Sequence, residues 1–435
     1  MGKGETQMKE VLKPVSKRDV ELVKELSIAL ASIFKKKVDL LEDHLIEYTK
    51  SKGLSRNSMV FAVSLYQKWQ ACNAVFSFLR DKTTHQKICS FDYDCDKLGA
   101  PTYTQIEIKR EVRKPVLVSG WFFFKYRGVG YGSHFDYGGK TAEFVLYYNK
   151  KHEVPAIGLI NELRTYMQEH NIFKNERLKV TDGVVLEFLE YPKLSFDDII
   201  LEKKLKEEIF LNLVFPLNNE ELCKEHKVPW RRGIILGGPP GTGKTMLAKV
   251  LCNTLKCTVI WVTTESITEP YDVKMVFEAA RYLNPTLIVF EDIDFLGKDR
   301  ELERNPVLGE LLNQLDGNAP NHGIFVLASS NRPGLLDKAL ANRPGRFDVQ
   351  LEINPPEINE RRQLIHLFSK DKKLSPDWNP EDLVLKSNGL TGAHIQELFT
   401  YATLYSLQRG SKTITGESIN KALVQFKEKP NSLSR

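Results

Sequence analysis

The sequence of 435 residues is long enough for two or three domains, and its 42% hydrophobic and 27% charged residues are typical of a globular protein, not a disordered or fibrous one. The formal net charge of +6 is mildly basic, without the concentrated basic stripe of a dedicated nucleic-acid-binding protein. The six cysteines have no metal-ligand spacing and predict reduced thiols in a cytoplasmic protein. No signal peptide and no run of about 18 apolar residues occurs, so neither a secreted nor a membrane-spanning protein is expected.

The first hundred residues predict a helical region. Apolar residues recur at helical spacing in three segments, 19–34, 38–48 and 58–79, with a break at Gly53. We therefore expect residues 1–100 to form a helical N-terminal region.

Residues 101–192 predict a small α+β domain. The segments that predict strands are 103–109, 116–126, 142–148 and 184–191, and a helical pattern covers 157–170. The glycines at 128, 130 and 132 predict a flexible hairpin loop and not a phosphate loop, because no helix pattern follows them. The aromatic run Trp121–Phe124 is interpreted as core and not as a platform for stacking bases.

Residues 193–435 predict an α/β fold in which strands and helices alternate. The short apolar runs of buried parallel-strand type are 233–237, 258–263, 286–290 and 323–328. Helical patterns lie between these runs, as in βαβ crossovers.

The strongest motif lies between the first of these runs and the helix pattern that follows it. It satisfies the P-loop pattern with Gly238, Pro239, Pro240, Gly241, Thr242, Gly243, Lys244 and Thr245. Glycines let backbone N–H groups approach phosphates, a lysine neutralises the β- and γ-phosphate oxygens, and a threonine hydroxyl can bind Mg²⁺. The motif therefore predicts that ATP and Mg²⁺ bind here.

Three further groups of polar residues follow strands in the order that this chemistry requires. Glu291 and Asp292 follow the run 286–290, where a P-loop fold places a metal-binding acid and a water-polarising acid. Asn331 follows the run 323–328 and can both donate to and accept from an attacking water. Arg343 and Arg346 surround a Pro-Gly turn and can stabilise charge on a transferred phosphoryl group.

Residues 193–430 resemble the ATPase module of the AAA family, which has this ordered set of motifs. The resemblance implies a P-loop α/β subdomain over 193–357 and a helical lid over 358–435. It also implies further contacts to the nucleotide and its adenine, from Asp198, Ile199, Met246, His366, Gly392 and Ala393. The implied assembly is a ring, usually a hexamer, in which Arg343 and Arg346 reach the nucleotide of a neighbouring subunit. Lys244, Glu291, Asp292 and Asn331 would be the other catalytic residues, with Thr245 and Glu291 on the metal.

Three features depart from the usual family pattern. The acidic pair is Glu291 then Asp292 instead of Asp then Glu, which predicts slower turnover but retained activity. The segment 264–272 has no aromatic-apolar-glycine tip, so Tyr271 is expected to lie in a connecting turn and threading of a client is not expected. The segment from Asp337 to Arg343 is one residue longer than usual, which leaves open which arginine faces the phosphate.

The acid order and the short segment are similar to those of relatives of the mitochondrial AAA translocase of the Rieske protein, although no membrane helix is found here. The absence of an HExxH motif argues against a fused zinc protease. We therefore expect an ATP-hydrolysing ring that chaperones or remodels a protein client, with residues 1–192 holding the client. The alternatives are a scaffold that binds ATP but scarcely hydrolyses it, and a nucleic-acid remodeller, which is the least favoured interpretation.

Overall fold

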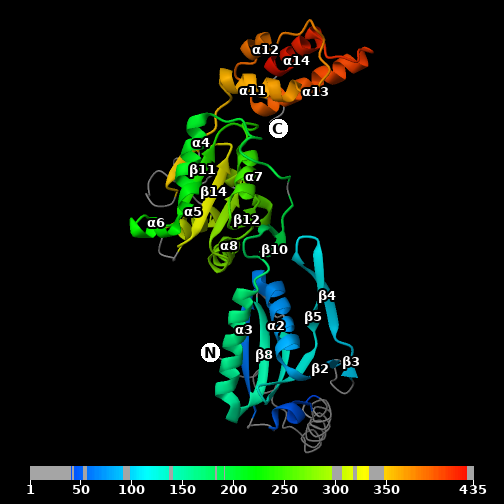
Figure 1. Ribbon diagram of the computed structural model, residues 1–435, viewed down its shortest axis with the longest axis vertical. Coiled ribbons are helices and arrows are strands. Elements are labelled where there is room, and N and C mark those ends of the chain that lie inside the picture. The colour runs from blue at the N-terminus through cyan, green and yellow to red at the C-terminus, as the bar shows by residue number, and fades with distance from the viewer. Residues whose placement is uncertain are drawn as a thin grey trace, which may run out of the picture. The chain divides into compact units, whose positions relative to one another are not determined.

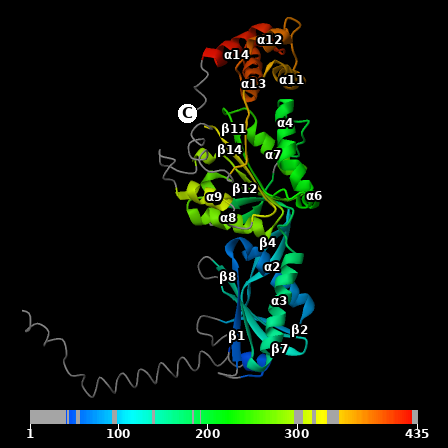
Figure 2. The same cartoon turned by 90° about the vertical axis from the view of Figure 1, so that its left-hand side faces the viewer.

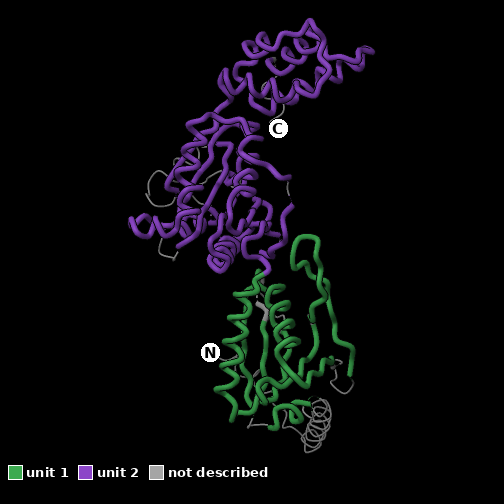
Figure 3. Tube along the Cα trace, viewed as in Figure 1, with its two compact units in different colours: residues 1–171 green, residues 172–435 purple. Residues whose placement is uncertain are grey.

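The computed structural model describes residues 41, 44–51, 56–91, 98–136, 141–181, 184–190, 192–295, 306–316, 321–332 and 347–428. The chain divides into two compact units, residues 1–171 and residues 172–435, shown in green and purple in Figure 3. None of the helices in the described segments combines the length and apolarity that a membrane span needs.

The first unit is built on a six-stranded sheet in the order β1-β8-β7-β6-β2-β3, with antiparallel neighbours (Figure 1). Its strands are β1 (Arg56–Ser64), β2 (Thr84–Phe91), β3 (Leu98–Gly99), β6 (Trp121–Tyr126), β7 (Val129–Asp136) and β8 (Thr141–Asn149). A separate hairpin joins β4 (Thr102–Lys109) to β5 (Val112–Ser119).

Two helices, α2 (Lys68–Lys82) and α3 (Glu153–Glu169), cover one face of this sheet and bury the main core of the unit (Figure 2). Phe122 and Phe124 lie in this core, and Phe123 is buried on the opposite face beside Leu45. The prediction that the aromatic run 121–124 belongs to the core is therefore confirmed.

The predicted helix over 58–79 is wrong in its first part, because residues 56–64 form strand β1 and pair with β8. Phe61 and Val63 are buried while Val60 and Ala62 are exposed, which is the two-residue period of a half-buried strand. Since β1 and β2 share a sheet with β6–β8, the expected division at residue 100 does not separate two structural units. The predicted helix 19–34 lies outside the described residues.

The glycine run predicted as a flexible loop lies mostly in strand β7. Gly128 occupies the turn before it, whereas Gly130 and Gly132 are within the strand. A Cβ atom on Gly130 would lie 1.8 Å from the carbonyl oxygen of Tyr48, and one on Gly132 would lie 2.7 Å from Leu45. Gly130 and Gly132 therefore allow the helical residues 44–49 to pack directly on the sheet. The loop prediction holds for Gly128, in the turn of the β6–β7 hairpin, and is wrong for Gly130 and Gly132.

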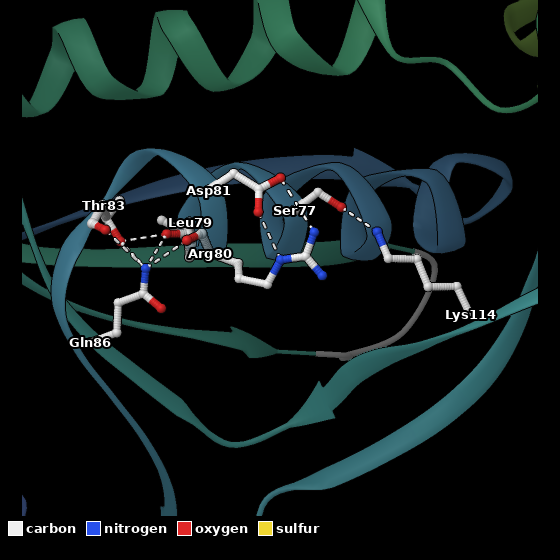
Figure 4. A network of polar contacts seen from close by, with 7 residues as sticks. All are labelled: Ser77, Leu79, Arg80, Asp81, Thr83, Gln86 and Lys114. Carbon is white, nitrogen blue, oxygen red and sulfur yellow. Dashed lines mark hydrogen bonds and ion pairs between the residues drawn. The ribbon is translucent and has the colours of Figure 1, made fainter.

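A cluster of polar contacts surrounds the C-terminal end of α2 (Figure 4). The amide nitrogen of Gln86 donates to the carbonyl oxygens of Leu79 and Arg80, both at 2.9 Å, and of Thr83 at 3.0 Å. These carbonyls lie at the end of the helix, where the ladder of helical hydrogen bonds runs out, and they share the two N–H hydrogens of one side chain from β2. Lys114 of β5 donates to Ser77 at 2.8 Å and ties the hairpin to the same helix.

The second unit is built on a seven-stranded sheet in the order β10-β9-β12-β13-β14-β11-β15, parallel except for β10. Its strands are β9 (Arg177–Thr181), β10 (Val185–Phe188), β11 (Arg232–Gly237), β12 (Thr258–Val262), β13 (Thr286–Phe290), β14 (Ile324–Ser330) and β15 (Val349–Glu352). The expected strand at 184–191 therefore belongs to this sheet and not to the preceding domain, because β10 pairs with β9 and β9 pairs with β12.

Helices lie on both faces of this sheet, so the α/β fold class is confirmed. The helices that accompany this sheet are α4 (Lys203–Ile209), a π-helical turn (Phe210–Val214), α5 (Phe215–Asn218), α6 (Glu220–Glu225), α7 (Lys244–Thr254), α8 (Pro270–Tyr282) and α9 (Pro306–Leu315). Helices α4 and α7 share one core with the sheet, and Phe277 of α8 stacks on Phe290 of β13.

Four further helices have a hydrophobic core of their own, beyond the last strand. They are α11 (Ile358–Ser369), α12 (Pro380–Lys386), α13 (Gly392–Gln408) and α14 (Gly416–Glu428). Their arrangement in Figure 1 is that of a small helical subdomain attached to the sheet through the segment after β15.

Candidate nucleotide-binding site

The P-loop lies between strand β11 and helix α7, as the motif predicts. Lys244 begins the helix, and its side chain is only 6% exposed. Its ammonium group donates to the carbonyl oxygens of Gly238 at 2.7 Å and Pro239 at 2.9 Å. The lysine therefore folds back along its own loop, at the end of the helix where backbone N–H groups point outward and favour an anion.

Two glycines of the loop have conformations and surroundings that exclude a side chain. Gly238 has a φ of 141°, and a Cβ atom there would lie 2.3 Å from the carbonyl oxygen of Ile353. Gly241 has a φ of 78°, and its Cβ atom would lie 2.8 Å from the Cβ of Ala393. Because no L-residue fits either position without movement, the glycines of the motif follow from the fold as well as from phosphate access.

The order of the strands brings the remaining polar residues to the P-loop. Strand β14 lies between β11 and β13, and all three are parallel. Asn331, which follows β14, is therefore placed between the loop after β11 and the acids after β13, at the edge where open α/β sheets bind ligands.

Asn331 is hydrogen bonded to two of these acids. Its side-chain nitrogen donates to Asp292 at 2.9 Å, and its backbone N–H donates to Asp294 at 3.1 Å. The backbone N–H of Asp292 donates to Ser329 at 3.0 Å, and this residue has a φ of 49°, in the left-handed region. Contacts from β14 thus hold Asp292 in a conformation that is uncommon for a residue other than glycine.

The charges at the site perturb one another. Burial raises the pKa of Asp292 above its ordinary value, and the negative charges of Asp294 and Glu291 raise it further, against the opposing effects of Lys244 and Asn331. Burial lowers the pKa of Lys244, while Asp292 and Asp294 oppose that shift. Both shifts mark groups whose charged forms are poorly solvated, which is a frequent property of binding sites.

Glu291 lies differently from Asp292. Its Oε2 atom accepts a hydrogen bond of 3.0 Å from the indole nitrogen of Trp261 on strand β12, and its backbone N–H donates to Val262 at 3.1 Å. Glu291 is not part of the pocket lining, whereas Asp292 is.

A pocket of about 660 Å³ opens beside the P-loop, within the range of small-molecule sites. The expected residues that line it are Asp198, Ile199, Pro240, Gly241, Thr242, Gly243, Lys244, Thr245, Met246, Asp292, Asn331, Gly392 and Ala393. His366 is exposed and does not line the pocket, and its contact with the base stays a prediction. Helix α11 instead presents Leu364, Leu367 and Phe368, because His366 projects from another face of that helix.

The helical subdomain contacts the P-loop directly. The backbone N–H of Ala393 donates to the carbonyl oxygen of Gly241 at 3.1 Å. Ala393 lies in the first turn of α13, where N–H groups have no partner within the helix, so the P-loop carbonyl satisfies one of them. Thr391 caps the same helix by accepting from the backbone N–H of His394.

The oxygen donors at the site suit a hard cation such as Mg²⁺. Thr245 supplies a hydroxyl, and Asp292 and Glu291 supply carboxylates. Within the described segments, no group of three His, Cys, Asp or Glu side chains could hold a metal alone. Mg²⁺ usually binds through one or two protein groups together with substrate phosphates.

Two other predictions about the site have different outcomes. Arg343 and Arg346 lie outside the described residues. Tyr271 lies in the first turn of helix α8, where it is partly exposed, so its expected place in a connecting turn is wrong. The preceding segment is compact, because the carboxylate of Asp272 accepts from the backbone N–H groups of Thr268 and Glu269, both at 2.9 Å.

Sequence reasoning missed several residues of the pocket and its support. Glu360, Phe368 and Gln396 line the pocket, and Trp261 holds Glu291. The helical period of α11 and α13 could have indicated which side chains share a face with Leu364 and Ala393, but no motif marks Trp261.

Comparison with known proteins identifies the part of the chain that contains this site. Residues 234–355 match the family model described as "ATPase family associated with various cellular activities (AAA)". The chain is 32% identical over 258 residues to the ATP-dependent zinc metalloprotease FtsH of Mycoplasma mobile, covering 56% of this chain and 36% of the relative. It is 31% identical over 258 residues to the proteasome-activating nucleotidase of Aeropyrum pernix, covering 56% of this chain and 62% of the relative.

A solved chain from the study "Structural Basis for Katanin Self-Assembly" is similar to 53% of this chain, at 28% identity and a TM-score of 0.46, and 84% of that chain is covered. This chain spans about a third of the length of the zinc metalloprotease and about three fifths of the length of the nucleotidase. The matched residues 234–355 include the P-loop, the acids after β13 and Asn331. These groups follow three strands of one sheet, β11, β13 and β14. The chain therefore contains an AAA ATPase domain with the α/β P-loop fold.

Proposed function

We propose that this protein hydrolyses ATP with Mg²⁺ as a ring-forming, hexameric assembly in the cytoplasm, and uses the energy to remodel or chaperone a protein client. The observation that supports this most strongly is the joint position of Lys244, Asp292 and Asn331 beside one pocket. The relatives named as a zinc metalloprotease and a proteasome-activating nucleotidase support a role in handling proteins.

In the proposed reaction, the backbone N–H groups of the P-loop and the ammonium group of Lys244 bind the phosphates of ATP. Lys244 would exchange its two loop carbonyl partners for phosphate oxygens, and an anion would compensate a cation that burial leaves poorly solvated. Thr245 and Glu291 would hold Mg²⁺, which when bound neutralises charge on the β- and γ-phosphates.

Asp292 would orient and polarise the attacking water, and Asn331 would hold that carboxylate in place. The hydrogen bond between them supports this division of roles, because a positioned acceptor needs a fixed partner. Ile199, Met246, Gly392 and Ala393 would surround the adenine, and Arg343 and Arg346 would complete the site of a neighbouring subunit.

The client would be held by residues 1–192 and would not be threaded past Tyr271. The capped, compact turn before α8 supports this, since it leaves no extended loop to grip a chain. The likeness to relatives of the Rieske-protein translocase remains a prediction, as does the identity of the client.

Phosphate release by the purified protein tests the proposal. Wild type should release phosphate in the presence of ATP and MgCl₂, and Lys244→Ala should not. Asp292→Asn should still bind ATP while its turnover falls by at least about 100-fold, as for loss of a catalytic base. Background release by wild type across protein concentrations and with candidate clients would refute hydrolysis.

A second candidate is an ATP-gated scaffold that scarcely hydrolyses ATP. Its specific support is the acid order, in which Glu291 precedes Asp292. For a scaffold, Asp292→Asn should change neither ATP retention nor the already low turnover, which separates it from the enzyme. The nucleic-acid hypothesis gains no support from the aromatic run, because Phe122, Phe123 and Phe124 are buried and cannot stack on bases.

A further inference from the structure

The indole of Trp261 contacts Glu291, the first of the two acids that follow β13. Trp261 lies in strand β12, next to β13, and its nitrogen donates to Glu291 Oε2 at 3.0 Å. The side chain is 6% exposed, so packing holds the donor in one position. A buried donor that reaches a carboxylate directly after β13 is placed to control where that carboxylate points.

Glu291 is anchored to the neighbouring strand at two points. Its backbone N–H donates to the carbonyl oxygen of Val262 at 3.1 Å, and its Oε2 atom accepts from Trp261. Within the described segments, no other hydrogen-bond partner of its carboxylate occurs, so Oε1 is the oxygen left available. The two hydrogen bonds to β12 fix the backbone of Glu291 and the carboxylate at the tip of its side chain, which otherwise has three free torsions.

The nature of the donor also matters. An indole N–H can only donate, so it can pair only with an acceptor oxygen of this carboxylate. Glutamate is longer than aspartate by one methylene, which adds reach and rotational freedom that a metal-binding acid must lose on binding. A fixed donor on the adjacent strand removes that freedom before any ligand arrives.

We propose that Trp261 is a positioning residue that holds Glu291 so that its second oxygen faces the metal bound with ATP. This deepens the proposed function and depends on it, because it assumes that Glu291 acts on the metal side. It also gives a physical reason why glutamate serves where the family usually has aspartate. Partners that orient metal-binding groups commonly change metal affinity about 10–100-fold when they are removed.

The test compares Trp261→Phe with a matched control, Trp230→Phe. Trp230 is also 6% exposed, and its indole nitrogen donates to the carbonyl oxygen of Pro216 at 2.7 Å. Both substitutions remove one indole hydrogen bond and a similar buried volume from the same core. Only Trp261 touches a residue of the proposed site.

The readout is equilibrium binding of a fluorescent ATP analogue, measured once with excess EDTA and once while MgCl₂ is titrated. We expect Trp261→Phe to need about tenfold more Mg²⁺ for the same gain in nucleotide affinity, with unchanged affinity in EDTA. Trp230→Phe should match wild type in both conditions. An unchanged Mg²⁺ requirement in Trp261→Phe would overturn the proposal. A lower requirement would also overturn it, because it would mean that the indole holds Glu291 away from the metal.

A second variant keeps the inference testable if Trp261→Phe fails to fold. Glu291→Asp shortens the side chain and should break the contact with the indole, raising the Mg²⁺ requirement on its own. If the tryptophan acts through Glu291, the double variant should be no worse than the more affected single variant, whereas additive effects would contradict the inference. Failure of wild type itself to bind the analogue would refute the proposed function, a result distinct from any difference between the variants.

Discussion

Replacement of Gly241 by alanine tests whether the P-loop and the helical subdomain are held together as the structure indicates. Gly241 has a φ of 78°, and a Cβ atom there would lie 2.8 Å from the Cβ of Ala393 and 2.9 Å from the hydroxyl of Thr391. Carbon atoms that are not bonded approach favourably only to about 3.5–4 Å, so α13 or the loop must move by about 1 Å.

The magnitude follows from three contributions. A left-handed conformation costs a residue other than glycine about 1–2 kcal/mol. Overpacking of a tight contact costs about 1–3 kcal/mol. The hydrogen bond from Ala393 N–H to the carbonyl of Gly241 contributes about 1 kcal/mol, and it is lost if the helix shifts.

Gly410→Ala is the matched control. Gly410 has the same φ of 78°, and no atom lies within 4 Å of the point that an added Cβ would occupy. It therefore carries only the conformational cost, and the difference between the two variants isolates contact between the loop and α13. We expect Gly241→Ala to be less stable than Gly410→Ala by about 2–4 kcal/mol.

Hydrogen exchange of the nucleotide-free protein is the most direct assay. The amide of Ala393 should exchange at least about tenfold faster in Gly241→Ala than in wild type, and at the wild-type rate in Gly410→Ala. ATP affinity should fall in the first variant alone. Equal protection of Ala393 in both variants would refute the contact between the P-loop and α13.

Three further outcomes are expected. Arg177→Met should lower the free energy of unfolding, measured in urea, by about 2–3 kcal/mol. The reason is that the guanidinium donates to the carbonyls of Cys252 and Leu255 at the end of α7. An unchanged urea midpoint would contradict this capping role. Burial raises the pKa of Cys257 from 9.0 to about 12, so the thiol loses its proton at lower pH in the unfolded chain than in the folded one. The free energy of unfolding should therefore fall as pH rises from 9 to 12, and it should fall less steeply in Cys257→Ala. Gly130→Ala should displace the helical residues 44–49, seen as faster exchange of the Lys50 amide, and wild-type exchange there would argue against the close packing.

The nucleotide-binding motif could be predicted from the sequence because its requirements are local. Glycines at 238, 241 and 243 adopt positive φ values, and the helix begins at Lys244, directly after them. The apolar runs of the ATPase sheet were predicted for the same reason, since a fully buried parallel strand is marked by its own composition.

Where the sequence misled, two local patterns competed. The segment 58–79 contains apolar residues compatible with a helix throughout, yet its first part pairs with β8, about 80 residues later. The glycines of β7 resembled a loop because the helical residues 44–49 that require them are far away in the chain. In each case the deciding partner lay outside any window that a periodicity can cover.

The chain by itself determined the P-loop, the buried strands and the polar residues that follow them. Only the tertiary structure decided that β14 lies between β11 and β13, which joins Asn331 to Asp292, and that Trp261 reaches Glu291. The physical reason is that backbone conformation and burial leave a local signature in the sequence. A hydrogen bond between residues 30 or more positions apart depends on the order of strands in the sheet, which no local pattern of residues specifies.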